Sequence, residues 1–155
     1  MSQKKAGSSL PFSFVRLAAL LAAAGAALAQ PMAVVELNAG MHRIRAEVAA
    51  DYATRMRGLM HRETVPANAG MLFLFDEPAA HCMWMKNTLI PLSVAFLDEH
   101  GIILNIADMQ PQTEQSHCAA APARLALEMT RGWFSQRGIK PGARLGGLEP
   151  LQRAR

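Results

Sequence analysis

The sequence lacks the short motifs that identify common enzyme classes. No Gly-x-Ser-x-Gly, His-Glu-x-x-His or phosphate-binding loop occurs in its 155 residues. Ser93 stands in an apolar stretch without an evident base, so we do not expect it to be a nucleophile. We predict no catalytic residues and no cofactor, and we expect an accessory or binding domain rather than an enzyme. A small hydrolase remains an alternative.

No apolar run in the chain is long enough to cross a membrane, because a spanning helix needs about 20 residues. The apolar run Leu17 to Ala29 is shorter, follows Lys4, Lys5 and Arg16, and ends on Ala27-Leu28-Ala29, which is a small-x-small cleavage pattern. We therefore predict a secretory signal peptide over residues 1–29 and a soluble mature domain over residues 30–155. The expected location is periplasmic or extracellular. An uncleaved amphipathic anchor is the alternative.

The predicted mature chain has almost no net charge. Removing the signal peptide removes three of the 16 basic residues and none of the 12 acidic residues, which leaves a formal charge of +1. Its basic residues are scattered and do not alternate with aromatic residues, which disfavours nucleic-acid binding. We expect no stable membrane insertion after signal cleavage, and the sequence names no protein partner.

Cysteine is scarce, and both cysteines lie in the predicted mature part. An oxidising compartment would allow Cys82 and Cys118 to pair. The alternative is two buried free thiols, since Cys is among the most often buried residue types. We predict a disulfide that ties a long loop at residues 107–122 to the centre of the chain.

Short apolar stretches separated by turns predict a mainly β fold (β-rich α+β) with one or two short helices. We expect a single compact antiparallel domain, barrel-like or sandwich-like, with a core over about residues 35–148. Parallel α/β folds are disfavoured, because no helical crossovers between strands are evident. The expected strands cover 34–37, 44–48, 70–75, 82–98 with a break at Pro91, 102–106, 124–129 and 143–148. The expected helices cover 51–61, capped by Asp51, and 133–136, and the tail from residue 150 is expected to be frayed.

The stretch from Cys82 to Asp98 is the centre of this prediction. As an extended segment, it would place Cys82, Trp84 and Lys86 on one face. Because its surroundings are so apolar, the Lys86 ammonium needs a partner or a cavity.

A set of polar residues could form a binding site near this strand. If Arg55 and Arg62 belong to the helix that packs over this strand, they would converge with Lys86, and an excess of cations would attract an anion. The pocket would accept a small polar ligand such as a carboxylate, a phosphate or an acidic sugar. The alternative is an internal salt-bridge network, with a glutamate that neutralises one cation. The residues of this candidate site are Arg55, Arg62, Lys86, Asn87 and Glu128.

A second group of residues suggests an alternative function, binding of copper(I) in the periplasm. Thioether, thiolate and imidazole ligands suit the monovalent ion. Packing of methionine in the core is the competing interpretation, and a disulfide would remove two of the ligands. We therefore predict no metal site. The residues of the alternative are His81, Cys82, Met83, Met85, His117 and Cys118.

Four ordered motifs resemble the domain of unknown function 192 family. They are Arg55-x-x-Gly58-Leu59-Met60-x-Arg62, Gly70-Met71-Leu72-Phe73, Trp84-Met85-Lys86-Asn87-Thr88 with Pro91-Leu92, and Leu127-Glu128 ahead of Gly132. The resemblance covers roughly residues 35–148 and implies a small, often exported, mostly β domain. It implies no established activity. Family members commonly carry Asp where this chain has Ser93, and Asp98 is the nearby carboxylate expected to be available.

Overall fold

The computed structural model describes residues 31–153, so the predicted signal peptide lies outside the described residues. The described chain begins with the first two predicted strands, β1 (Val34–Ala39) and β2 (His42–Ala49), which form an antiparallel hairpin. Gly40 turns the chain between them with a φ of 60°, a conformation that glycine adopts without strain. The prediction of these two strands is confirmed.

The helix α1 (Tyr52–Arg57) follows, and Asp51 caps it as predicted. The Asp51 carboxylate accepts a hydrogen bond from Thr54 N at 2.9 Å. The chain then enters β3 (Ala69–Ala79), which runs parallel to β2. The expectation that no helical crossover exists was therefore wrong at this one place. The segment between β2 and β3 is long enough to carry the chain back along the sheet, as a parallel pair requires.

The Cys82–Asp98 stretch is not one extended segment, which corrects the prediction. Only β4 (Cys82–Met83) and β5 (Leu92–Leu97) are strands. Between them the chain turns, with Asn87 at a φ of 54° and Thr88 N donating to the Met85 carbonyl. Asn tolerates this left-handed conformation better than most residues. Trp84 and Lys86 are therefore loop residues.

The remaining elements include the predicted strands and the second predicted helix, together with β7, which lies inside the predicted loop 107–122, and α3, which was not predicted. They are β6 (Ile103–Met109), β7 (His117–Cys118), β8 (Ala123–Thr130), α2 (Trp133–Gln136), β9 (Leu145–Gly146) and α3 (Glu149–Arg153). The last predicted strand is reduced to two residues. The tail expected to be frayed begins as α3, in which the Leu151 amide donates to the Leu148 carbonyl.

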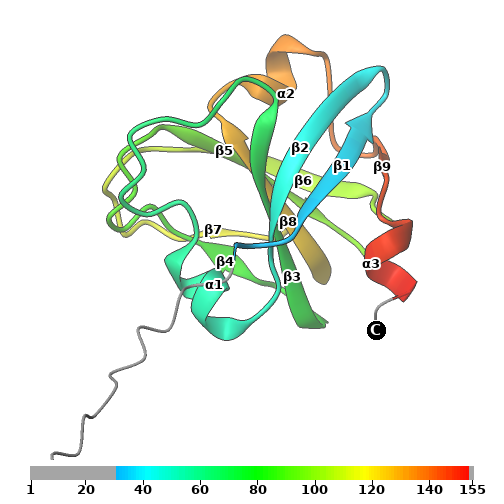
Figure 1. Cartoon of the computed structure of the whole chain (residues 1–155), viewed down its shortest axis with the longest axis horizontal. Coiled ribbons are helices and arrows are strands. Elements are labelled where there is room, and N and C mark those ends of the chain that lie inside the picture. The colour runs from blue at the N-terminus through cyan, green and yellow to red at the C-terminus, as the bar shows by residue number, and fades with distance from the viewer. Residues whose placement is uncertain (1–30, 154–155) are drawn as a thin grey trace, which may run out of the picture. The chain divides into compact units, whose positions relative to one another are not determined.

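Seven strands form one sheet in the order β6-β5-β8-β3-β2-β1-β9, and β4 and β7 form a separate pair. All pairs are antiparallel except β2 with β3. The sheet curls until Ile102, just before β6, bridges to Arg144, just before β9. The mainly β, barrel-like prediction is confirmed (Figure 1).

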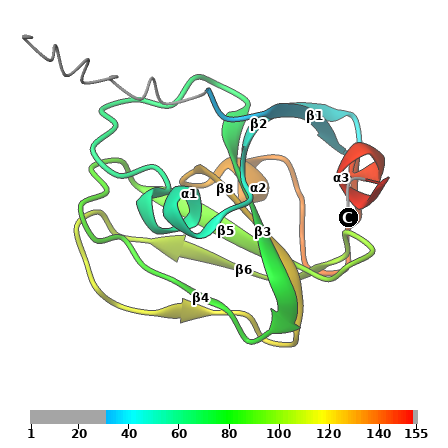
Figure 2. The same ribbon diagram turned by 60° about the horizontal axis from the view of Figure 1, so that its bottom comes forward.

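Strands β5 and β8 bury both of their faces, and so does the first part of β3, residues 70–73. We call the concave side of the curled sheet the interior face; it holds Leu72, Leu97 and Leu127 with Trp133 and Phe134. We call the other side the α1 face, because α1 and the β4–β7 pair lie over it. Figures 1 and 2 show α1 and β4 on one side of the described domain and α3 on the opposite side.

Candidate functional site

Strand β8 places a glutamate in the core of the α1 face. Its side chains alternate, with Leu125, Leu127 and Met129 on the interior face and Ala126 on the α1 face. Glu128 therefore points to the α1 face, and only 3% of its surface is exposed. Both neighbouring strands set apolar residues beside it, since Glu128 is in register with Met71 of β3 and Val94 of β5.

The Glu128 carboxyl group is buried without a partner. No hydrogen bond or ion pair joins it to any residue in the part of the chain that the structure describes. Burial alone raises the pKa of Glu128 from its ordinary value near 4.5 to about 8, because the ionised form loses its water. Buried polar groups in proteins are nearly always paired, so this carboxyl group requires an explanation.

Glu128 lines a small chamber of about 30 Å³ beneath the end of α1, which we call the Glu128 chamber. Its walls include Gly58 and Leu59 after the helix, Phe73 of β3 and Thr88 of the turn. A side chain on Gly58 would lie 3.3 Å from the Phe73 ring, so glycine lets the end of the helix approach the strand. The Thr88 hydroxyl donates to the Lys86 carbonyl rather than to Glu128.

A larger cavity of about 300 Å³ adjoins the Glu128 chamber, and we call it the α1 groove. The two share lining residues from α1, β3 and the β4 segment, among them Met56, Phe73 and Trp84. The groove walls are mostly apolar, yet Tyr52, Met56 and Trp84 are exposed by 72%, 44% and 40%. An apolar cavity with a single buried ionisable group at its end is the usual form of a small-molecule site.

The apolar walls of the groove were not predicted from the sequence. Tyr52 and Met56 stand four apart on α1 and therefore share one side of the helix. No residue of α1 is buried. The available signal was the pair of large apolar residues at helical spacing in a helix with little else to bury.

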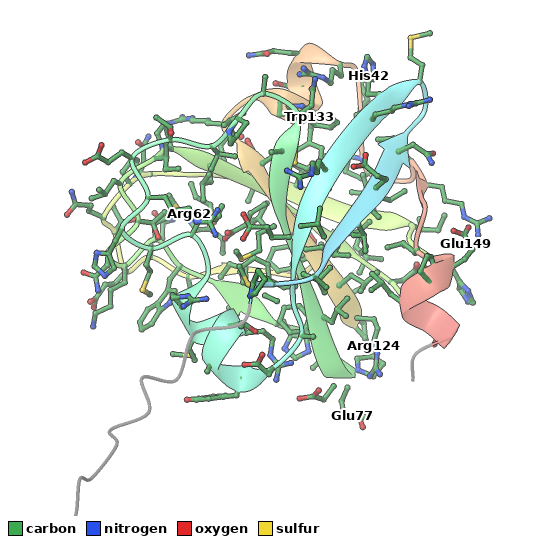
Figure 3. The ribbon with its side chains drawn as sticks, viewed as in Figure 1. His42, Arg62, Glu77, Arg124, Trp133 and Glu149 are labelled. Atoms are coloured by element: carbon green, nitrogen blue, oxygen red, sulfur yellow. A yellow bond between two sulfur atoms is a disulfide. The ribbon has the colours of Figure 1, made fainter. Side chains whose placement is uncertain are left out.

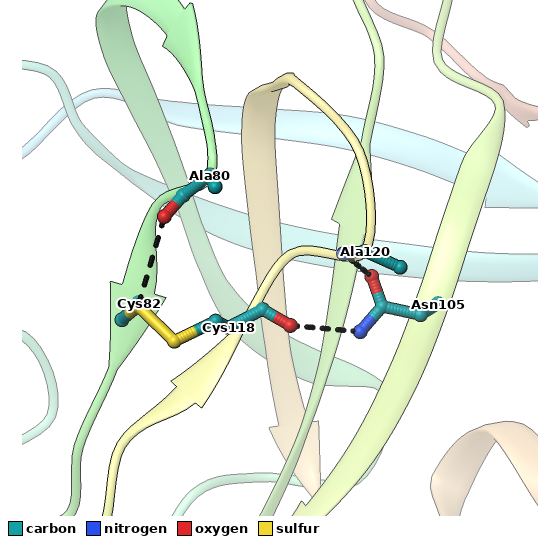
Figure 4. The surroundings of a disulfide bond; sticks show 5 residues. All are labelled: Ala80, Cys82, Asn105, Cys118 and Ala120. Carbon is teal, nitrogen blue, oxygen red and sulfur yellow. Dashed lines mark hydrogen bonds between the residues drawn. A yellow bond between two sulfur atoms is a disulfide. The ribbon is translucent and has the colours of Figure 1, made fainter.

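The predicted disulfide is present between Cys82 and Cys118. The two residues face each other across the β4–β7 pair with their Cα atoms 3.9 Å apart. Asn105 of β6 donates to the Cys118 carbonyl and accepts from the Ala120 amide (Figure 4). The disulfide therefore fixes the β4 segment, which forms one wall of the α1 groove, and it is compatible with an exported protein.

Arg55 lies in the wall of both cavities, and its charge is already neutralised. Its guanidinium group donates to the Ala50 and Leu74 carbonyls at 2.6 and 2.8 Å and pairs with Asp76 at 2.8 Å. These bonds tie α1 to the end of β2 and to β3. Of the predicted polar set, Arg55 and Glu128 are the two that line the same cavity.

The other two predicted cations lie elsewhere, each beside its own carboxylate. Arg62 lies in the chain that connects α1 to β3 (Figure 3), and it makes two bonds to Glu47 of β2 at 2.6 and 2.7 Å. This pairing lowers the pKa of Glu47 and raises that of Arg62. Lys86 pairs with Glu114 at 3.2 Å and lies 5.4 Å from the Trp84 ring centre. The predicted convergence of three cations is therefore absent from the described structure.

Asn87 forms a turn of the backbone and does not line the α1 groove. It occupies the left-handed turn, and its carbonyl accepts a hydrogen bond from His61 N at 2.9 Å. Its backbone therefore holds the loop after α1 against the loop after β4.

The residues of the copper alternative do not form a common site. Cys82 is paired with Cys118, and Met85 is fully buried. Met83 is in register with His117. Because neighbouring residues of a strand point to opposite faces, this pair and the disulfide lie on opposite faces of the β4–β7 pair. His117 Nε2 is buried without a partner. Within residues 31–153 no three His, Cys, Asp or Glu residues are grouped to hold a metal ion.

Comparison with known proteins places the chain in a family. The family DUF192, described as an uncharacterized ACR, matches residues 33–147. The chain belongs to the DUF192 family. This confirms the resemblance of its four motifs and assigns no activity.

Two solved structures show the same fold. One is a Sinorhizobium meliloti 1021 protein, proposed to be a transcription regulator; it is 34% identical, with a TM-score of 0.72 over 77% of this chain and 97% of that chain. The other is a Novosphingobium aromaticivorans DSM 12444 protein of unknown function; it is 33% identical, with a TM-score of 0.71 over 74% of this chain and 86% of that chain. The search of curated proteins found no match.

Ser93, at the position where the family resemblance led us to expect Asp, is buried, and its hydroxyl is bonded. Its hydroxyl donates to Asp108 at 2.5 Å and accepts from Gly132 N at 2.9 Å. Asp108 of β6 therefore supplies a carboxylate beside Ser93. Asp98, the expected substitute, instead caps its hairpin by accepting from His100 N and Ile102 N.

No helix within residues 31–153 is long and apolar enough to span a membrane.

Proposed function

We propose that this DUF192 protein is an exported binding domain that takes up a small ligand with an apolar body and a polar tip. The apolar body lies in the α1 groove, between Tyr52 and Met56 on one side and Met83 and Trp84 on the other. The polar tip enters the Glu128 chamber. The observation that carries the proposal is the unpartnered Glu128 carboxyl group at the end of an apolar groove.

Two features support the groove as a preformed site. The disulfide holds the β4 wall, and the Arg55 bonds hold the α1 wall, so both walls are fixed without a ligand. Preorganised walls lower the entropic cost of binding. A second cavity of about 430 Å³, lined partly by Val48, Leu74 and Arg124, has no buried ionisable group and is less suited to a specific ligand.

Export is part of the proposal, and nucleic-acid binding is not. The disulfide and the signal-like residues 1–29 support an oxidising location outside the cytoplasm. The regulatory role proposed for the Sinorhizobium meliloti protein is not extended to this chain, because its acidic and basic residues nearly balance after residue 29.

A thermal-shift screen of the mature chain with a library of small amphiphilic metabolites tests this function. A bound ligand stabilises the folded state and raises Tm. Met56→Ala should reduce that shift, since Met56 lines the groove. Met41→Ala is the matched control, because Met41 is 89% exposed on the β1–β2 turn. A ligand that stabilises the two variants equally would place binding elsewhere and contradict the proposal.

A further inference from the structure

The charges around Glu128 define what its missing partner must be. From α1, Arg55 is occupied by Asp76 of β3, and Arg57 is exposed. In the loop after β4, Lys86 is paired with Glu114, and just before β4 His81 Nε2 bonds to the Glu77 carbonyl. Strand β5 carries no charged residue. None of these groups shifts the Glu128 pKa, so no charge of the described protein neutralises its carboxylate.

The rim of the Glu128 chamber adds hydrogen-bond acceptors. The chamber lies at the C-terminal end of α1, where the final carbonyls of a helix have no partner within the helix. The carbonyls of Arg55 and Met56 accept no hydrogen bond from any described residue, whereas the Arg57 carbonyl accepts from the Met60 amide. A group with several N–H donors could therefore bond to Glu128 and to this rim together.

The two cavities differ in size, so each suits a different part of a ligand. A volume of about 30 Å³ admits one group of about the size of a water molecule, such as an ammonium group. The adjoining groove of about 300 Å³ has room for an apolar body. The Trp84 ring at their common wall is exposed by 40%, and the Lys86 ammonium group already lies 5.4 Å from its centre.

We propose that the Glu128 chamber is a binding site for a primary ammonium group, so that the ligands of the α1 groove are small organic amines with an apolar body. This inference rests on the proposed function, whose ligand class it specifies. Binding forms an ion pair between the Glu128 carboxylate and the ammonium group. The proton that the Glu128 carboxyl group carries in the empty site passes to solvent, and the amine keeps its own proton.

The proton release makes the affinity depend on pH. With the Glu128 pKa near 8, the empty site holds a neutral acid at pH 6, and binding releases close to one proton there and about half a proton at pH 8. The apparent affinity should therefore rise almost tenfold between pH 6 and pH 7 and level off above about pH 8. A ligand that accepted a hydrogen bond from neutral Glu128 would show the opposite trend.

Calorimetric titration with 2-phenylethylamine and 2-phenylethanol tests the inference, since the two probes differ only in the polar tip. The expected result is tighter binding of the amine, with proton release measured in buffers of different ionisation enthalpy at pH 6, 7 and 8. Glu128→Gln should remove both the amine preference and its pH dependence, whereas Glu63→Gln, an exposed control, should remove neither.

The outcomes separate the two proposals. If the alcohol binds as tightly as the amine, or the amine binds without proton release, the ammonium site is wrong and the groove function stands. If neither probe binds, the groove itself is not a ligand site, and both proposals are overturned. Should Glu128→Gln fail to fold, proton release by the wild-type protein decides the question alone.

Discussion

The two faces of the central strands differ in how completely their side chains are packed. On the interior face, Trp133 and Phe134 close the core, and the buried Trp133 Nε1 donates to Asn68 at 3.0 Å. The rings of Trp133 and His42 also meet edge to face, with their centres 6.3 Å apart (Figure 3). The α1 face instead leaves Tyr52, Met56 and Trp84 exposed around an unpartnered acid. A local departure from good packing is expected where a site is kept for a ligand.

The largest expected effect is on the pH dependence of stability. Because the folded-state pKa of Glu128 is raised to about 8, its contribution to stability is complete below about pH 4.5 and is lost as pH rises to 8. Relative to Glu128→Gln, the wild-type protein should lose on the order of 4 kcal/mol of unfolding free energy over this range. Denaturant unfolding between pH 4.5 and 9 measures this. Parallel pH profiles for the two proteins would show that the carboxyl group is not buried unpaired.

Truncating one phenylalanine on each face compares how well the faces are packed. Phe134→Ala should cost about 3 to 5 kcal/mol, because Phe134 is fully buried in the interior face. Phe75→Ala should cost only about 1 kcal/mol, since Phe75 is half-buried and stacks on His81 beside the α1 groove. Equal losses in urea unfolding would mean that the α1 face is as closely packed as the interior face.

Opening the disulfide should weaken the α1 face selectively. The double substitution Cys82→Ala with Cys118→Ala is expected to cost about 2 to 4 kcal/mol of unfolding free energy. Amide exchange should increase first in β4 and β7, whereas β8 amides stay protected. Uniformly faster exchange across β3, β5 and β8 would show instead that the disulfide supports the whole fold.

The smallest effect is expected at Arg62, which the sequence had placed in the binding site. Arg62→Gln removes a partly exposed ion pair with Glu47, at a cost of less than about 1 kcal/mol. The loss should shrink in high salt and at low pH, where Glu47 is protonated. Amine affinity should be unchanged. A tenfold weaker affinity would show that Arg62 contributes to the binding site.

The sequence predicted the fold better than the site. The pattern of short apolar stretches predicted the first two strands, and Asp51 predicted the start of α1, because these depend on local interactions. The crossover from β2 to β3 was missed because strand direction depends on distant pairing. The long Cys82–Asp98 strand was wrong because the left-handed turn at Asn87 leaves only a weak local signal.

Glu128 was named in the site for a different reason from the one that the structure gives. The sequence suggested that it neutralises a cation. Its isolation follows from Met71 and Val94 on the adjacent strands, and that register is not visible in one sequence. For the same reason, the partners Asp76, Glu47 and Glu114 could not be matched in advance to their cations.

The central claim is that Glu128 is a buried acid without a partner, and carboxyl carbon NMR of the wild-type protein tests it most directly. Titration of the Glu128 carboxyl resonance, assigned by comparison with Glu128→Gln, should give a pKa of about 8 in the free protein. Saturating 2-phenylethylamine should lower that pKa. A pKa near 4.5 in the free protein would show that Glu128 is solvated or already paired, and it would contradict the account.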